Sequence, residues 1–277
     1  KSWFNPGFLR LAKITWDTKA AVLEKIMKYE RVHKIKDMDE LKRRLGEDRR
    51  FFSYFHPALE DEPIIFVQVA LTNGLGKSIQ EITKPHTTGN KKYDTATFYS
   101  ISNCQEGLSR VTLGNFLIKR VVYEIQEELP DIKHFGTLSP IPGFRDWFSY
   151  LEENKIKNIL GNVPLENISF LKSPDLKIGD TRIVSNKDAI LKLVAHYLIN
   201  EKNHKQLPIN DVTRFHLGNG AIVEDININA NVSEVGFNRS FGVMVNYLYE
   251  LKNIEKNHED YINNKKVIVS DKLKKFI

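Results

Sequence analysis

The spacing of apolar residues predicts helices at the start of the chain and strands directly after them. Apolar residues recur at helical spacing over residues 18–29, and a shorter basic helix is expected over residues 38–45. Strands are expected over residues 50–56, 63–71 and 95–102. The run over 63–71 is apolar almost without interruption, which is typical of a strand covered on both faces. Residues 1–50 are therefore expected to form a helical layer ahead of a sheet.

A strand, a glycine-containing loop, a helix and another strand follow one another in the middle of the chain. The helix, over residues 115–129, has its apolar residues on one face and ends at Pro130, and a strand over 132–138 follows. The loop before the helix consists of Ser109, Arg110, Val111, Thr112, Leu113, Gly114 and Asn115. A helix that begins at a glycine loop presents free N–H groups and the positive end of its dipole, so this loop is a candidate phosphate cradle. Ordinary turn chemistry explains Gly114 equally well, and both interpretations stay open.

The rest of the chain predicts more helices, then two strands, then a terminal helix. The clearest helix covers residues 187–199, within a mostly helical stretch over 145–200. Strands are expected over residues 220–228 and 242–248, and a lysine-rich surface helix over 250–277. Because neither an internal repeat nor a low-complexity linker interrupts the chain, we expect one domain over residues 1–277. It would comprise the N-terminal layer 1–50, a core over 51–249 and a C-terminal segment over 250–277.

Residues 137–144, which read Thr-Leu-Ser-Pro-Ile-Pro-Gly-Phe, place an unusual hydroxyl at the end of the strand over 132–138. Each proline fixes its own φ, gives up its N–H and holds the residue before it extended. We therefore expect this segment neither to continue a ladder nor to begin a helix smoothly, and we expect Ser139 to lie on a rigid arm. Taken alone, the pattern is also what a strand-terminating turn requires.

Composition and charge narrow the classes of function. The chain has 277 residues, 41% of them hydrophobic, and a net charge of +6, which suits nucleic acid, a membrane surface or an anionic small molecule. The basic residues are scattered except at Lys42-Arg43-Arg44 and Arg49-Arg50, and the first of these groups predicts a solvated helix face with phosphate or partner contact as the alternative. No apolar run is long enough to span a membrane, and no secretory signal opens the chain. The chain begins with Lys rather than Met, so we expect upstream sequence to be missing.

The single cysteine and the histidines limit the chemistry further. Cys104 alone can form neither an internal disulfide nor a cysteine-built zinc site, which favours a reducing compartment such as the cytoplasm. No histidine pair has metal-ligand spacing, so no metal is expected. His216, between an aromatic residue and a glycine turn, is a candidate acid or base, although a structural histidine has the same pattern. A Ser-His-acid hydrolase is disfavoured because there is no Gly-x-Ser-x-Gly elbow and Pro140 lacks an N–H for an oxyanion hole.

These motifs, in this order, resemble the malonyl-CoA decarboxylase family, and the resemblance covers nearly the whole chain. It rests on Phe4-Asn5-Pro6-Gly7-Phe8-Leu9, Phe98-Tyr99-Ser100-Ile101-Ser102, Leu113-Gly114-x-Phe116, Leu138-Ser139-Pro140-Ile141-Pro142-Gly143-Phe144, Phe215-His216-Leu217-x-Asn219-Gly220-Ala221 and Met244-x-Asn246-Tyr247-x-Tyr249. The resemblance implies an α/β (α+β) protein of GNAT-like acyltransferase fold, with a central mixed β-sheet flanked by helices. It also implies that the loop 109–115 holds CoA, that Ser139 contacts the malonyl carboxylate, and that His216 donates a proton.

The family's reaction implies what the remaining residues do. Malonyl-CoA loses its carboxylate as CO₂ because the thioester holds the electrons as an enolate, so no cofactor is expected. An imidazole with an ordinary pKa near 6.5 would suit the proton transfer at neutral pH. Asn219, Asn246 and Tyr247 are expected to support the pair or to face the enolate. The alternative function is a GNAT-type acyltransferase that passes the acyl group to an amine.

Two departures from the family pattern affect the remaining expectations. Arg110 stands where the family tends to carry a glycine, and the family's preceding helical domain, which takes part in assembly, is expected to be absent. Whether this chain forms a homo-oligomer is therefore left open, and a mitochondrial or peroxisomal location is the alternative to the cytoplasm. A CoA-sensing or nucleic-acid-binding module is disfavoured because the basic residues lack interleaved aromatic side chains. We expect neither nucleic acid nor a membrane as a partner.

Overall fold

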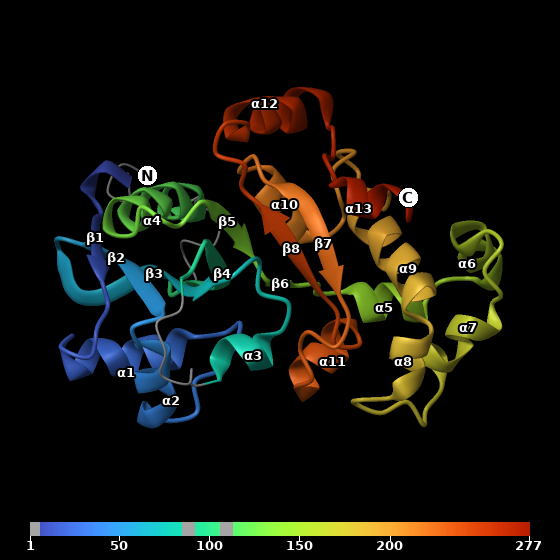
Figure 1. The fold of residues 1–277 in the computed structure, drawn as a ribbon, viewed down its shortest axis with the longest axis horizontal. Coiled ribbons are helices and arrows are strands. Elements are labelled where there is room, and N and C mark those ends of the chain that lie inside the picture. Colours follow the sequence, from blue (N-terminus) through green and yellow to red (C-terminus); the bar gives the residue numbers. More distant parts are fainter. Residues whose placement is uncertain (1–5, 85–91, 106–112) are drawn as a thin grey trace. The chain divides into compact units, whose positions relative to one another are not determined.

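A computed structural model describes residues 6–84, 92–105 and 113–277, and its chain divides into two compact units (Figure 1). The first unit contains residues 1–76 and 81–136, and the second contains residues 77–80 and 137–277. The short helix α3 (Ile79–Thr83) is divided between them. None of the helices in these ranges is both long and apolar enough to cross a bilayer.

The first unit is a sheet with helices on its faces. Its helices are α1 (Ala20–Tyr29), α2 (Met38–Arg44) and α4 (Leu113–Glu128), preceded by the 3-10 turn η1 (Pro6–Phe8). Its strands are β1 (Arg10–Lys13), β2 (Arg49–His56), β3 (Leu59–Thr72), β4 (Thr95–Asn103) and β5 (His134–Thr137), in that order across the sheet. β1 to β4 are antiparallel neighbours. Figure 1 shows α1 and α2 on one face of this sheet and α4 on the other.

Burial explains why these residues form these elements. Val22, Leu23 and Ile26 of α1 are buried in one cluster with Phe66 of β3. All residues over 63–71 are buried, which confirms the prediction of a strand covered on both faces. The apolar face predicted for α4 is buried at Leu117, Ile118, Val121, Val122 and Ile125.

The prediction of a purely helical N-terminal layer is wrong at β1. Arg10 to Lys13 form a four-residue edge strand paired with β2, in the register Arg10 to Phe55 and Lys13 to Phe52. The strand has charged ends and is too short for its apolar alternation to stand out. Its pairing with β2 therefore decides its conformation, and no local pattern predicts it.

The second unit combines a small sheet with a helical region. Its helices are α5 (Phe144–Ser149), α6 (Glu153–Leu160), α7 (Glu166–Ser169), η3 (Phe170–Lys172), α8 (Thr181–Ser185), α9 (Lys187–Ile199), α10 (Asp211–Leu217), α11 (Glu234–Ser240), α12 (Ile254–Asn264) and α13 (Asp271–Lys274). Its strands are β6 (Ser139–Pro140), β7 (Ile222–Asn227) and β8 (Met244–Leu248), and both β6 and β7 pair antiparallel with β8. The predicted helix over 187–199 is confirmed, and the two predicted strands are confirmed with narrower bounds.

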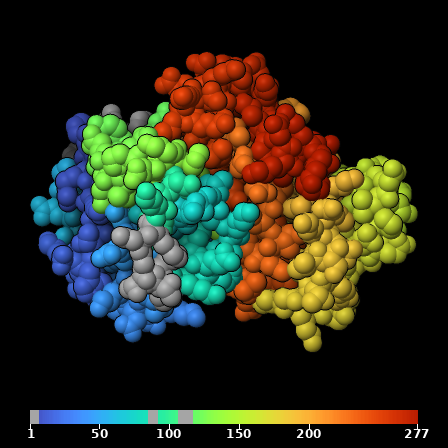
Figure 2. Space-filling model, viewed as in Figure 1, coloured from blue at the N-terminus to red at the C-terminus, as the bar shows by residue number. Residues whose placement is uncertain are grey.

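Two predictions for this unit are wrong. Ser139 and Pro140 do continue into a ladder, opposite Val245 and Met244, because proline lacks only its N–H and the other backbone groups stay available to β8. The segment over 250–277 is not one surface helix. Between α12 and α13, Val269 forms a parallel bridge with Val223 of β7, and Val223 donates its N–H to the Ile268 carbonyl at 3.0 Å. Figure 2 shows the red C-terminal atoms lying against the orange part of the unit that contains β7.

Candidate functional site

Ser139 and His216, which are 77 residues apart in the sequence, meet in the second unit. β6 carries the serine and α10 carries the histidine, and 3.1 Å separates the serine Oγ from the imidazole Nε2. Both side chains are buried, with exposed fractions of 6% and 3%. The structure therefore brings together the two residues for which the sequence predicted catalytic roles.

Two further hydrogen bonds determine where the protons lie in this pair. Ser139 donates its hydroxyl to Thr137 Oγ1 at 2.8 Å, so its only proton is already used. His216 Nε2 must then carry the hydrogen that it shares with the serine oxygen. The other ring nitrogen, Nδ1, lies 2.8 Å from the Tyr249 hydroxyl and accepts a hydrogen bond from it. The hydrogen-bond network thus assigns a neutral imidazole protonated at Nε2.

Aromatic rings surround the imidazole and set its charge state. Tyr247 stacks on it with 4.4 Å between ring centroids and 24° between planes, and Phe215 and Tyr249 form T-shaped contacts with it, at 77° and 69° between planes. Complete burial lowers the pKa of His216 to about 3, because a charged ring would lose its hydration there. This differs from the expectation of an ordinary pKa near 6.5. Burial also raises the pKa values of Tyr247 and Tyr249, so both phenols keep their protons at neutral pH.

The start of α10 is fixed by its cap. Asn210 accepts the backbone N–H of Thr213 with its Oδ1 at 2.9 Å, as is usual for an N-cap asparagine. Thr213 Oγ1 lies 2.7 Å from the Tyr247 hydroxyl, so the hydroxyl of the ring that stacks on His216 is anchored to the same helix. These contacts place the imidazole relative to β8.

The three residues predicted to support the pair are used for internal contacts. Tyr247 holds the ring of His216 by stacking. Asn246 donates to the Thr137 carbonyl at 2.7 Å and accepts from the Asn227 side chain at 2.6 Å, and it thereby fixes the strand ends beside Ser139. Asn219 donates to the Phe215 carbonyl at 2.6 Å, which closes the turn after α10.

The predicted CoA loop lies mostly outside the described residues. Ser109, Arg110, Val111 and Thr112 are outside them, and Leu113, Gly114 and Asn115 form the first turn of α4. This turn lies in the first unit, whereas Ser139 and His216 lie in the second.

Sequence reasoning missed Thr137 and Tyr249, the partners of the serine and the histidine. Each stands two residues from a residue that was named, Ser139 in one case and Tyr247 in the other. Alternate residues of an extended segment face the same side. The two-residue spacing from Ser139 to Thr137 and from Tyr247 to Tyr249 was therefore the signal that pointed to these two residues.

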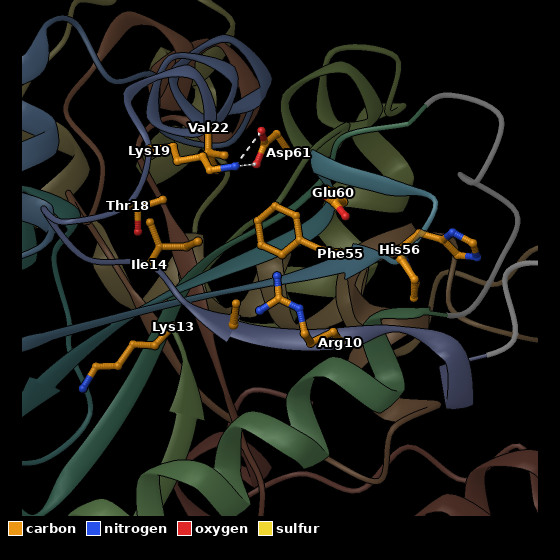
Figure 3. Close-up of a pocket in the computed structure, with 12 residues that line it drawn as sticks. Arg10, Lys13, Ile14, Thr18, Lys19, Val22, Phe55, His56, Glu60 and Asp61 are labelled. Atoms are coloured by element: carbon orange, nitrogen blue, oxygen red, sulfur yellow. Dashed lines mark hydrogen bonds and ion pairs between the residues drawn. The ribbon is translucent and has the colours of Figure 1, made fainter.

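The first unit contains a pocket of about 460 Å³ that is separate from this pair (Figure 3). Arg10 lies over the ring of Phe55 on one wall, at 5.7 Å from the centroid, and Lys19 pairs with Asp61 on another at 2.9 Å. Neither Ser139 nor His216 lines it. Among the described residues, no three His, Cys, Asp or Glu side chains are grouped as metal ligands would be.

Comparison with solved structures first defines the class. The loading GNATL domain of CurA from Lyngbya majuscula superimposes with a TM-score of 0.55 over 90% of this chain and 99% of that domain, at 12% identity. The protein therefore has a GNAT-like α/β fold, as the sequence predicted.

Closer relatives then define the family. The family model of the malonyl-CoA decarboxylase C-terminal domain matches residues 7–277. The crystal structure of malonyl-CoA decarboxylase from Agrobacterium vitis is 42% identical, with a TM-score of 0.90 over 99% of this chain and 68% of that one. Mitochondrial malonyl-CoA decarboxylase from Anser anser anser is 37% identical over 297 residues. The chain belongs to the malonyl-CoA decarboxylase family. It spans 59% of the length of the Anser relative.

Proposed function

We propose that the protein decarboxylates malonyl-CoA to acetyl-CoA and CO₂. The observation that carries the proposal is the buried contact of 3.1 Å between Ser139 Oγ and His216 Nε2, in a chain of this family. Decarboxylation beside a thioester requires a group that orients the carboxylate and a group that delivers a proton to the carbon left behind. A fixed hydroxyl next to an N–H donor supplies both.

The reaction follows from these two groups. Ser139 turns its hydroxyl from Thr137 Oγ1 to the malonyl carboxylate, donates a hydrogen bond to it, and holds it out of the plane of the thioester carbonyl, which weakens the bond to be broken. That carbon–carbon bond breaks, CO₂ leaves, and the electron pair passes into the thioester as an enolate. The Nε2 proton of His216 then forms the new C–H bond, which gives acetyl-CoA.

Burial makes the proton donor a neutral imidazole. A thioester enolate is a stronger base than the anion of imidazole, so the transfer requires no imidazolium. As the Nε2 proton leaves, the Tyr249 hydroxyl, 2.8 Å from Nδ1, stabilises the negative charge on the ring through its hydrogen bond. Solvent finally restores the one proton that the reaction consumes.

The remaining assignments belong to the same proposal. Residues 109–115 hold the CoA moiety, and Asn219, Asn246 and Tyr247 position the catalytic pair through the contacts described above. Residues 1–277 act as one catalytic domain, in a reducing compartment such as the cytoplasm or a mitochondrion. Malonyl-CoA is the partner that this assignment requires.

The test is to incubate the purified protein with malonyl-CoA and no acyl acceptor, and to measure CO₂ and acetyl-CoA. We expect both products in equal amounts. The variant His216→Asn should lower turnover about 100-fold or more while CoA binding survives, because general acid catalysis contributes about 10² to 10⁴-fold. Product formation that depends strictly on an added amine would instead identify an acyltransferase. A His216→Asn variant within tenfold of the parent would remove this residue from the mechanism.

A further inference from the structure

Ser139 and His216 belong to segments that approach the site from different directions. Ser139 lies on an arm that runs from β6 to Gly143, and His216 lies in the last turn of α10. The pairing of Ser139 with Val245 fixes the beginning of the arm against β8. A second contact must fix the end of the arm relative to α10 in order to maintain the distance of 3.1 Å between Ser139 Oγ and His216 Nε2.

The end of the arm is held through one carbonyl group, that of Pro142. It accepts two hydrogen bonds, from Asn210 Nδ2 at 2.9 Å and from the Tyr197 hydroxyl at 3.0 Å. The tyrosine comes from α9, which carries neither catalytic group. Asn210 is the residue that caps α10.

Asn210 uses both ends of its amide, and its exposed fraction is only 2%. Its Oδ1 accepts from the backbone N–H of Thr213 at 2.9 Å and from Thr213 Oγ1 at 3.1 Å, and its Nδ2 holds Pro142. Thr213 precedes His216 by three residues, about one helical turn, and its hydroxyl contacts that of Tyr247. A single side chain thus joins the serine arm to the helix of the histidine.

We propose that Asn210 is a positioning residue that sets the register between the serine arm and α10, and so the contact between Ser139 and His216. Only an amide supplies a donor at one end and an acceptor at the other within this short reach. A serine or an aspartate would still cap the helix, but neither would hold Pro142 at neutral pH. The expected effect on catalysis rests on the proposed function, whereas the effect on the geometry of the pair does not.

The test compares Asn210→Ser with Tyr197→Phe as the matched control. Both variants remove one donor to the Pro142 carbonyl, and only the first breaks the link to α10. We expect Asn210→Ser to lower kcat about tenfold or more with KM nearly unchanged, since a displacement of 1 Å can cost about 100-fold. Tyr197→Phe should stay within about threefold of the parent kcat, because the hydrogen bond from Asn210 Nδ2 to the Pro142 carbonyl remains. Equal losses in the two variants would overturn the proposal.

A second measurement needs no turnover. In protein labelled with ¹⁵N-histidine, the Nε2 and Nδ1 resonances of His216 report its hydrogen bonds to Ser139 and Tyr249. Asn210→Ser should shift them and Tyr197→Phe should leave them in place. Unshifted resonances in Asn210→Ser contradict the proposal, even if the parent protein proves not to decarboxylate malonyl-CoA.

If Asn210→Ser does not fold, the variant Asn210→Asp tests the same proposal. An aspartate caps α10 as well as asparagine does, but its ionised form offers Pro142 only acceptors. We expect the kcat of this variant to be low at neutral pH and to recover relative to the parent as the pH falls and the carboxyl regains a proton to donate. A kcat equal to that of the parent at all pH values would overturn the role of the Nδ2 donor.

Discussion

At the scale of single residues, the site depends on which buried group donates each hydrogen bond. Ser139 donates a hydrogen bond to Thr137, Tyr249 donates one to His216 Nδ1, and the Nε2–H of the imidazole points at the serine oxygen. The sequence could name the serine and the histidine because each stands in a distinctive local pattern. It left out their partners, although each stands two residues from a named residue, because only the fold shows that Thr137 contacts Ser139 and that Tyr249 contacts His216.

The serine hydroxyl should discriminate between substrate and product. In the proposed reaction Ser139 contacts the malonyl carboxylate, so we expect Ser139→Ala to weaken binding of malonyl-CoA by about tenfold, as for a lost hydrogen bond to a charged group. Acetyl-CoA, which has no carboxylate, should bind within about twofold of the parent affinity. Isothermal titration with both ligands measures this. If both affinities fell equally, the role of Ser139 would be structural.

The lowered pKa of His216 should make the stability of the fold depend on pH. Its pKa is about 3 in the folded protein and near its ordinary value of 6.5 in the unfolded chain. The unfolded state therefore binds more protons between these values, so this contribution to stability is complete above pH 6.5 and is lost as the pH falls towards 3.

Urea unfolding of the parent and of His216→Asn measures the size of this effect. Between about pH 6.5 and about pH 5, the parent should lose about 2 kcal/mol of unfolding free energy more than the variant. His204→Asn, at an exposed histidine, is the control and should follow the parent. Parallel curves for the parent and His216→Asn would show that the folded state admits a charged imidazole.

At the scale of elements, long segments were predictable and short ones were not. The apolar run of β3 and the helical spacing of apolar residues in α9 predict a strand and a helix from local sequence. Each segment is long enough for its pattern of buried side chains to be recognised. β1 and β6 have four and two residues, and only their partners in the sheet make them strands. The β-branched run over 267–269 likewise becomes extended because β7 offers it a backbone to pair with. Tertiary contact decides such segments, and no local pattern can.

The turn after α10 should be intolerant of a side chain. Gly220 has φ of +79°, and a Cβ added there would collide with the backbone carbonyl of Ile254. We expect Gly220→Ala to destabilise the protein by about 3 kcal/mol, from the left-handed backbone and from the clash together. Gly179 has φ of +81° with open space around it, so Gly179→Ala should cost only about 1 kcal/mol. Thermal unfolding of both variants tests this, and similar losses would show that the Ile254 carbonyl can move away.

At the scale of the whole molecule, the family motifs predicted the GNAT-like fold better than the order of predicted helices and strands did. The element pattern alone indicated a βαβ arrangement, which many α/β folds share. The motifs over residues 138–144 and 215–221 added the two segments that the structure brings into contact. The asparagine that joins those segments, Asn210, lies in neither motif, because its role depends on the position of Pro142 in space.

The net charge of +6 should act on substrate capture and not on the chemical step. The phosphates of a CoA thioester are anionic, and salt screens their attraction to a basic protein over a Debye length of about 10 Å at 0.1 M. In the proposed mechanism the bond-breaking step takes place at Ser139 and His216, which are buried, and salt screens buried groups far less. We expect KM for malonyl-CoA to rise about threefold or more from about 50 mM to about 300 mM NaCl, with kcat within about twofold. A neutral osmolyte at matching osmolality is the control. If KM does not change with salt, the basic residues lie away from the path of the substrate. If kcat falls as salt is added, an exposed ion pair takes part in the chemical step.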